Sequence, residues 1–170
     1  MVAWTVLTAI DRPTDDMSRC IDSCSDDHTM YSWRNSIIAT TGDVPVGCLI
    51  AYDGGRYHEL RQRTWPSLWT DLEPSAITQT ADEAKAGEYY LDSMAILPEY
   101  RKLGIGKLLM EHAIAKGKES GCQCASLIVD CNKPRLKAYY ESIGFEDSRC
   151  MMFFGHVFFK MTRSLCPCGV

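Results

Sequence analysis

The stretch EYYLDSMAILPEYRKLGIGKLLMEHAIAKGKESGCQCASLIVD, residues 88–130, contains two apolar runs separated by an amphipathic segment. Residues 88–97 predict a strand, residues 104–118 a helix, and residues 124–130 a second strand. Two strands that are joined through a helix are usually parallel neighbours in one sheet, connected by a right-handed crossover. We therefore expect a parallel crossover unit here.

The start of the predicted helix has the composition of an anion-binding site. Gly104 and Gly106 allow positive φ values or a close approach of ligand to backbone, and Arg101, Lys102 and Lys107 supply cations. A helix N-terminus also exposes N–H groups that lack a partner within the helix, so a diphosphate would suit it. The spacing matches neither a P-loop nor G-x-G-x-x-G. Taken alone, a turn with incidental glycines explains these residues equally well.

The flanking residues complete a mixed α/β domain. Residues 35–40 and 44–52 predict an antiparallel hairpin around a Thr-Gly-Asp turn. Residues 134–143 predict a helix that begins at a proline and ends before a glycine. Residues 151–163 supply one or two further strands. Strands precede, separate and follow the helices, which indicates the α/β class.

Two segments are harder to interpret. Residues 53–87 contain one helix-like stretch that Pro66 would interrupt, then a polar, acidic stretch, which is typical of an insertion or lid. Residues 1–34 begin with an apolar run that fits a strand or a helix end, and they continue as a polar, turn-rich stretch. No repeat or linker divides the chain, so we expect a single domain over residues 1–170.

Composition argues against several kinds of partner. The net charge of −4 and the pI near 5.5 leave no basic surplus for binding nucleic acid. No apolar run is long enough to cross a membrane and no signal peptide is evident, so we expect no membrane partner and a cytoplasmic location. The cysteines lack C-x2-C spacing, which predicts reduced thiols and no metal site. The apolar late strands would allow a homodimer if a sheet edge is exposed.

Residues 101–106, Arg-Lys-Leu-Gly-Ile-Gly, match the acetyl-CoA motif [RQ]-x-x-G-x-[GA] of the GNAT family of N-acetyltransferases. The preceding MAILPEY, residues 94–100, resembles the end of the family's strand before that motif, and AYYESIGF, residues 138–145, is similar to its late helix. The chain therefore resembles a GNAT domain over about residues 35–162. This resemblance implies a central mixed, mostly antiparallel sheet with helices on both faces. Residues 1–34 lack the family's R-x-A-x-x-x-D opening and are atypical.

The resemblance implies acetyl-CoA as co-substrate. Its diphosphate would lie against the glycine turn, and its pantetheine arm would pair with the end of the preceding strand like an added strand. A backbone N–H near Ala95 or Ile96 would receive the developing oxyanion. The residues expected to contact the cofactor are Met94, Ala95, Ile96, Arg101, Lys102, Leu103, Gly104, Ile105, Gly106 and Lys107, with Asn132 or Lys133 before the late helix.

The implied reaction is direct attack of a primary amine on the thioester through a tetrahedral intermediate, without an acyl-enzyme. Tyr140 stands five residues before Phe145, where the resemblance implies the acid that protonates the departing thiolate. Tyr139 is the rival, because both tyrosines follow Leu136 at helical spacing. Packing on the apolar face of the helix is the alternative role for Tyr140.

For the proton acceptor we expect Asp92 or Glu88, which strand alternation puts on one face with Tyr90, Met94 and Ile96. A carboxylate among apolar neighbours has a raised pKa and can accept a proton. The alternatives are that Asp92 satisfies backbone donors inside the sheet and that Glu88 lies exposed at the start of the strand.

An acidic lining from Glu83, Glu88 or Asp92 would suit a cationic amine. A small amine, a peptide N-terminus and a lysine all fit this description. The alternative function is a CoA-binding sensor or scaffold module with weak turnover, and a purely structural α/β domain would bind no CoA at all.

Overall fold

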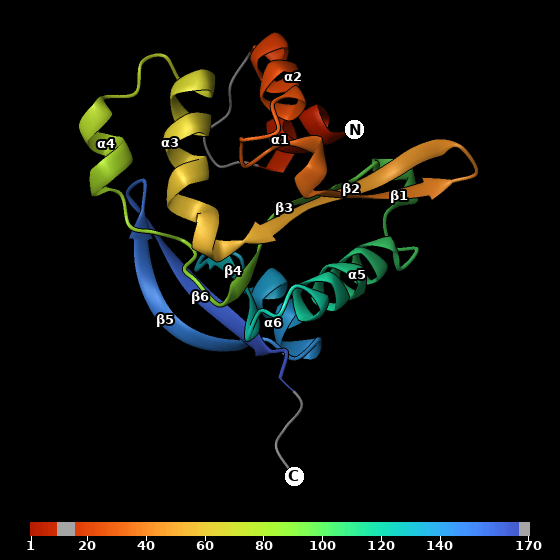
Figure 1. Ribbon diagram of the computed structural model, residues 1–170. Coiled ribbons are helices and arrows are strands. Elements are labelled where there is room, and N and C mark those ends of the chain that lie inside the picture. Colours follow the sequence, from red (N-terminus) through yellow and green to blue (C-terminus); the bar gives the residue numbers. More distant parts are fainter. Residues whose placement is uncertain (10–15, 167–170) are drawn as a thin grey trace.

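The structure, a computed structural model, describes residues 1–9 and 16–166. Its centre is a six-stranded mixed sheet with the strand order β1-β2-β3-β4-β6-β5 (Figure 1). The strands are β1 (Ser36–Thr41), β2 (Val44–Asp53), β3 (Glu88–Ile96), β4 (Cys124–Asp130), β5 (Glu146–Phe153) and β6 (His156–Ser164). Neighbouring strands are antiparallel except β3 and β4, which are parallel. The predicted hairpin and the two late strands are confirmed.

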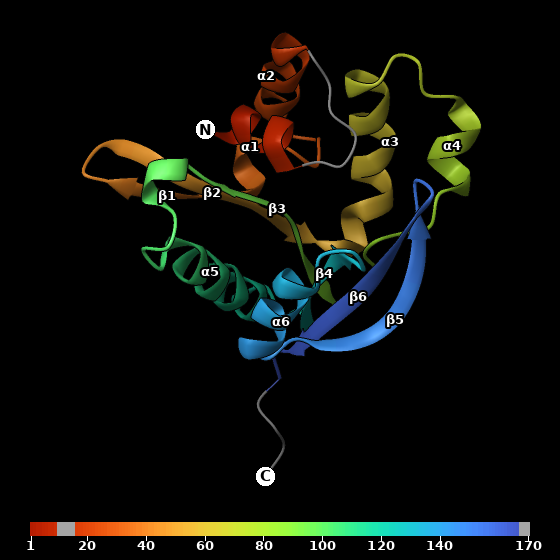
Figure 2. The ribbon, with the colours of Figure 1, turned by 180° about the vertical axis from the view of Figure 1, so that it is seen from behind.

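Helices cover both faces of the sheet, as predicted. They are α1 (Val2–Ala9), α2 (Met17–Ser25), α3 (Tyr57–Leu68), α4 (Pro74–Gln79), α5 (Ile105–Glu119) and α6 (Pro134–Ser142), with short 3-10 helices at Trp33–Asn35, Gly54–Arg56 and Pro98–Tyr100. The two opposite views show α1, α2 and α3 on one face and α5 and α6 on the other (Figures 1 and 2). Each face therefore buries its own apolar core.

Alternate residues of β2 supply these two cores. Ile50 packs in the core beneath α1 and α3, together with Val6 and Leu60. Leu49 packs on the opposite face with Leu109 of α5. Each of these residues is at most 2% exposed. Because both faces are covered, the β2 strand is apolar almost throughout instead of alternating with polar residues.

The predicted crossover unit is confirmed, with β3, α5 and β4 beginning and ending within one residue of the expected positions. The two parallel strands pair only at Glu88–Cys124, Tyr89–Ala125 and Tyr90–Ser126. Beyond these pairs β3 continues along β2 to Ile96, and β4 continues along β6 to Asp130. The sheet thus opens between the later halves of β3 and β4, which leaves backbone edges where an extended ligand can pair.

A β-bulge changes the face that the later half of β3 presents. Ser93 lies opposite Ile50 and Leu91 lies opposite Ala51, so Asp92 is the extra residue. An extra residue reverses the alternation of side chains. The expectation that Tyr90, Asp92, Met94 and Ile96 share one face is therefore wrong. Tyr90 packs in the core beneath α1 and α3, whereas Met94 and Ile96 pack against the core beneath α5.

The segment between β2 and β3 contributes to the core through α3. The buried residues of this helix are Tyr57, Leu60, Arg61, Thr64, Trp65 and Leu68. The expected interruption at Pro66 is wrong, because the helix continues to Leu68 and the Trp69 N–H donates to the Trp65 carbonyl at 2.9 Å. Pro66 lies in the last turn, where it removes one backbone hydrogen bond without ending the helix.

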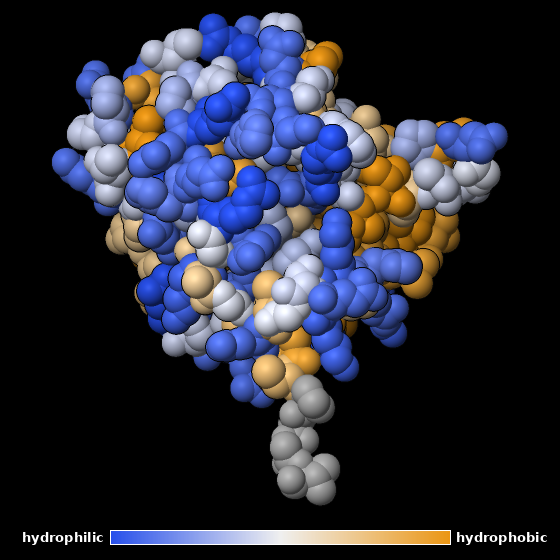
Figure 3. Space-filling model, in the orientation of Figure 1, coloured by the Kyte–Doolittle hydropathy of each residue, from blue (hydrophilic) through white to orange (hydrophobic). Residues whose placement is uncertain are grey.

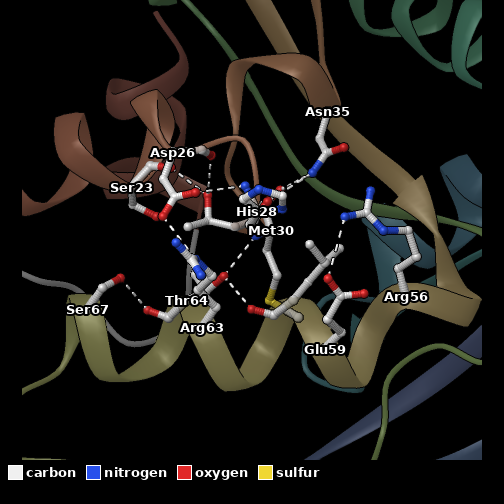
Figure 4. A network of polar contacts seen from close by, with 12 residues as sticks. Ser23, Asp26, His28, Met30, Asn35, Arg56, Glu59, Arg63, Thr64 and Ser67 are labelled. Carbon is white, nitrogen blue, oxygen red and sulfur yellow. Dashed lines mark hydrogen bonds and ion pairs between the residues drawn. The ribbon is translucent and has the colours of Figure 1, made fainter.

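The N-terminal segment forms two helices over the same face as α3. Val6 of α1 is fully buried, which explains why an apolar run without clear periodicity is helical. No strand is found in residues 1–9 and 16–34. Polar contacts connect this segment to α3 (Figure 4). The Met30 N–H donates to the Thr64 hydroxyl at 2.8 Å, and the Arg63 guanidinium lies 3.0 Å from a carboxylate oxygen of Asp26.

Polar residues cover much of the face seen in Figure 3, and apolar residues gather beside the β1–β2 hairpin and α5. Exposed apolar side chains of these elements include Val44 and Leu108. Within the described residues, no helix has both the length and the apolar character needed to cross a membrane.

Candidate active site

The opening between β3 and β4 leads into a cavity of about 330 Å³. Two strands and one helix line the cavity near this opening. The lining residues are Asp92, Ser93 and Met94 of β3, Ile128, Val129 and Asp130 of β4, and Leu136 and Tyr140 of α6. The cavity therefore joins the predicted acid, one predicted base and part of the predicted cofactor strand.

Asp92 lies at the β-bulge and faces this cavity. The hydroxyl of Tyr52 donates to one oxygen of its carboxylate at 2.6 Å, and the hydroxyl of Ser93 donates to the other at 2.7 Å. Burial raises the pKa of Asp92, and the two hydrogen bonds oppose that rise. A carboxylate that is held in this way is fixed in position and available as a proton acceptor.

Glu83 is a second carboxylate in the cavity, which sequence reasoning considered only as an acidic lining residue. The hydroxyls of Tyr57 and Tyr90 donate to its two oxygens at 2.6 and 2.5 Å. Burial, and then the charge of Asp92, raises the pKa of Glu83 to about 7. Its place on a polar segment without periodicity left no local signal beyond the acidic side chain itself.

Cations from three elements fix the segment that carries Glu83. Arg61 of α3 is 1% exposed and pairs with a carboxylate oxygen of Asp82 at 2.8 Å. Arg149 of β5 donates to the carbonyl of Asp82 at 3.2 Å, and Lys160 of β6 donates to the carbonyl of Glu83. These contacts fix the backbone of a segment that has no regular structure.

Glu88, the other predicted base, lies in a buried ion pair away from the cavity lining. Lys160 Nζ lies 2.6 Å from Glu88 Oε2, and the hydroxyl of Ser126 donates to the same oxygen at 2.9 Å. The side chains of Lys160 and Glu88 are only 2% and 6% exposed. Burial lowers the pKa of Lys160, and the neighbouring Glu88 opposes this effect. The arrangement connects β3, β4 and β6, and we assign Glu88 no part in proton transfer.

Of the two tyrosines on α6, Tyr140 lines the cavity, and Tyr139 is not among the lining residues. The Tyr140 ring also packs 6.1 Å from the ring of Phe145, so the expected packing role and a role in the cavity coexist. Burial, and then the neighbouring Tyr139, raises the pKa of Tyr140 to about 12. The phenol is therefore protonated at neutral pH and can act as a proton donor.

The glycine turn before α5 has the conformation that a diphosphate site requires. Gly104 has a φ of 83°, a backbone conformation that favours glycine. Crowding is not the reason for the glycine, because nothing lies within 4 Å of a Cβ built at this position. A Cβ on Gly106 would lie 3.3 Å from Ile96 Cδ1, so this glycine allows α5 to approach β3 closely. No side chain in the described part of the chain caps the helix at Gly104. Its first N–H groups remain available to an anion.

The other predicted cofactor residues surround this turn. Arg101, Lys102 and Leu103 are exposed, and so is Lys107 in the first turn of α5. The Arg101 guanidinium donates to the Ile96 carbonyl at 3.1 Å, which connects the turn to the end of β3. These residues fit the diphosphate of acetyl-CoA, because cations, unpaired N–H groups and an open approach coincide.

Asn132 and Lys133 precede α6, where sequence left the choice between them open. The Asn132 N–H donates to a carboxylate oxygen of Asp130 at 2.8 Å, and the side chain of Asn132 is exposed. Lys133 lines the cavity. Of the two, Lys133 belongs to the cavity lining and Asn132 does not.

A parallel strand pair that opens beside a glycine-containing helix start defines the fold of an acetyl-CoA-dependent N-acetyltransferase. The chain matches the acetyltransferase (GNAT) family over residues 7–145 and belongs to that family. The resemblance found in the motifs is thus confirmed, and the protein is an acyltransferase of this class. No curated protein sequence matches the chain.

Solved structures with the same fold include several acetyltransferases. An N-acetyltransferase from Staphylococcus aureus Mu50 has a TM-score of 0.74 and 22% identity, over 95% of this chain and 92% of that one. The ribosomal-protein-S18-alanine N-acetyltransferase from Escherichia coli has a TM-score of 0.61 and 16% identity, over 98% and 88%. The NatC complex bound to Gag peptide and CoA has a TM-score of 0.58 and 18% identity, over 96% and 89%. These likenesses concern the fold.

Proposed function

We propose that the protein transfers the acetyl group of acetyl-CoA to a primary amine that binds in the cavity between β3 and β4. One observation carries this proposal. Asp92 and Tyr140 face the same cavity from β3 and α6, at the place where the parallel strands separate. A proton acceptor, a proton donor and an open backbone edge for the thioester thus line one cavity.

Acetyl-CoA would be held by residues of the turn and of β3. The N–H groups of Ile105, Gly106 and Lys107 would bind the diphosphate, and exposed Lys102 would add charge. The edge of β3 at residues 94–96 does not pair with β4, so it would pair with the pantetheine arm. A backbone N–H of this edge, near Ala95 or Ile96, would receive the oxyanion.

In the reaction, the amine nitrogen attacks the thioester carbonyl carbon and forms the new C–N bond. Before this attack the bound ammonium loses one proton to Asp92, directly or through water, because only the neutral amine has a free lone pair. The tetrahedral intermediate then collapses, the C–S bond breaks, and the thiolate takes the phenolic proton of Tyr140. The acylated nitrogen gives up its extra proton, which restores the phenol. Burial raises the pKa of Tyr140, and it raises the basicity of a thiolate in the same cavity for the same reason. The pKa values of the phenol and the thiol therefore stay close, so the proton transfer costs little free energy.

The experiment is to mix the protein with acetyl-CoA and primary amines, and to measure CoA release together with the acetylated amine by mass spectrometry. We expect release that depends on the amine. The Asp92→Asn variant should lower kcat by about 100-fold or more while it retains affinity for acetyl-CoA. A folded wild-type protein that binds acetyl-CoA but acetylates no amine would contradict the proposal and favour a CoA-binding sensor.

A further inference from the structure

Aromatic rings from distant parts of the chain line one side of the cavity. They are Trp65 and Trp69 at the end of α3, and Phe153, Phe154 and Phe158 of the β5–β6 hairpin. The Trp65 and Phe154 ring centroids lie 5.3 Å apart, and those of Phe153 and Phe154 lie 4.7 Å apart. We call these five residues the aromatic wall. Both ribbon views show the tip of the hairpin near α3 and α4 (Figures 1 and 2).

The turn of the β5–β6 hairpin places Phe154 in a strained backbone conformation. Phe153 pairs with His156, so Phe154 and Gly155 form a two-residue turn, with φ values of 44° and 80°. Two successive positive φ values are typical of a type I′ turn, whose first position favours asparagine, aspartate or glycine. A phenylalanine there is strained and is retained only where the surroundings determine it. The chain therefore has an aromatic side chain at this edge of the cavity, at a turn position where asparagine, aspartate or glycine would be less strained.

Contacts made by α3 hold Trp65 of the wall in place. The Arg61 guanidinium lies 5.2 Å from the ring centroid of Trp65. The hydroxyl of Thr64, the residue before Trp65, accepts a hydrogen bond from the Met30 N–H of the N-terminal segment. Trp65, Trp69, Phe153 and Phe158 belong to the buried core, each at most 9% exposed, and Phe154 is half-buried. The wall is thus packed in place before a ligand binds, and Phe154 is its member most open to the cavity.

The charges in the cavity favour a cation. The ionisable acids in its lining are Glu83, Asp92 and Asp130, and the lining base is Lys133. Carboxylates beside apolar walls attract an ammonium group more strongly than they would in open water. The cavity thus offers two distinct chemistries, carboxylates for an ammonium and aromatic faces for a flat apolar group.

We infer that the amine acceptor is an arylalkylamine, in which a short alkyl chain joins the primary ammonium to an aromatic ring. This inference rests on the proposed function. Glu83 and Asp92 would hold the ammonium group, and the ring would lie against the aromatic wall. The cavity of about 330 Å³ would hold the acceptor together with the acetyl end of acetyl-CoA.

The test compares kcat/KM for phenethylamine, propylamine and spermidine. We expect phenethylamine to exceed the other two by about 10- to 100-fold, because the ring contacts are absent from them. Phe154→Asn should reduce this preference to within a few-fold while the protein stays folded, since Asn-Gly suits the turn. The matched control is Trp33→Ala, which removes an aromatic side chain that is 54% exposed and outside the cavity, and it should retain the preference.

The outcomes separate this inference from the proposed function. Propylamine or spermidine acetylated as well as phenethylamine would overturn the arylalkylamine inference and leave the acetyltransferase proposal standing. Acetylation of none of the three would overturn the arylalkylamine inference, and the proposed function would fail only if other primary amines, peptide N-termini and lysine included, also stayed unmodified. A preference for phenethylamine that Phe154→Asn leaves unchanged would show that the aromatic wall does not select the acceptor, which also overturns the inference.

Discussion

The hydroxyl of Tyr90 lies 2.5 Å from Glu83 Oε2, and this bond joins the first strand of the crossover to a carboxylate that precedes it in the chain. Tyr57 bonds the other oxygen of the same carboxylate. Burial and the charge of Asp92 raise the pKa of Glu83 to about 7 even so. The fold therefore keeps a carboxylate whose ionisation it disfavours, at the place where an amine would bind.

Glu83→Gln should make the folded protein more stable at pH 8. Because the folded state raises this pKa from 4.5 to about 7, stability is lost as pH rises between these values. The gain at pH 8 is on the order of 3 kcal/mol, from about 1.4 kcal/mol for each pKa unit. Urea unfolding at pH 4 and at pH 8 measures it. Exposed Glu59→Gln is the control and should change stability by less than about 0.5 kcal/mol.

Tyr140→Phe should lower kcat by about 100-fold or more, because the thiolate loses its proton donor. The affinity for acetyl-CoA should stay the same, since the ring remains in place. Tyr139→Phe is the matched control on the neighbouring residue and should keep near wild-type activity. Equal losses in the two variants would show that the hydroxyl facing the cavity is not the acid.

Lys160→Met should destabilise the protein by about 3–5 kcal/mol, because it leaves the buried Glu88 carboxylate without its partner. The double variant Lys160→Met with Glu88→Leu should recover part of this loss, since it removes both charges but leaves the Glu83 carbonyl without its donor. Chemical denaturation with tryptophan fluorescence measures both variants. A double variant no more stable than the single one would contradict the ion-pair account.

Local sequence patterns were sufficient to predict the crossover unit. The apolar runs at Glu88–Ile96 and Cys124–Asp130 and the amphipathic helix between them could be assigned from their length and local composition. Val2–Ala9 could not be assigned, because an almost entirely apolar run has no period and its packing around Val6 determines its conformation. The bulge at Asp92 also escaped prediction, because only pairing with β2 reveals an extra residue.

Some residues of the candidate site could also be predicted from local sequence, and others could not. The turn at Gly104 and the position of Tyr140 followed from short motifs, because each depends on neighbours in the chain. Glu83 did not, since Lys160, 77 residues away, fixes its carbonyl. The aromatic wall likewise combines α3 with the β5–β6 hairpin, and no local pattern connects these two elements.

Binding of acetyl-CoA at the turn of Gly104 is the central claim, and calorimetric titration of three proteins with acetyl-CoA tests it most directly. Wild type should bind. Gly104→Ala should bind nearly as well, since its Cβ meets no atom within 4 Å and the φ of 83° costs only about 1–2 kcal/mol of stability. Gly104→Glu should weaken binding at least about tenfold, because its carboxylate repels the diphosphate. No heat from folded wild type, or equal affinity in Gly104→Glu, would contradict the claim.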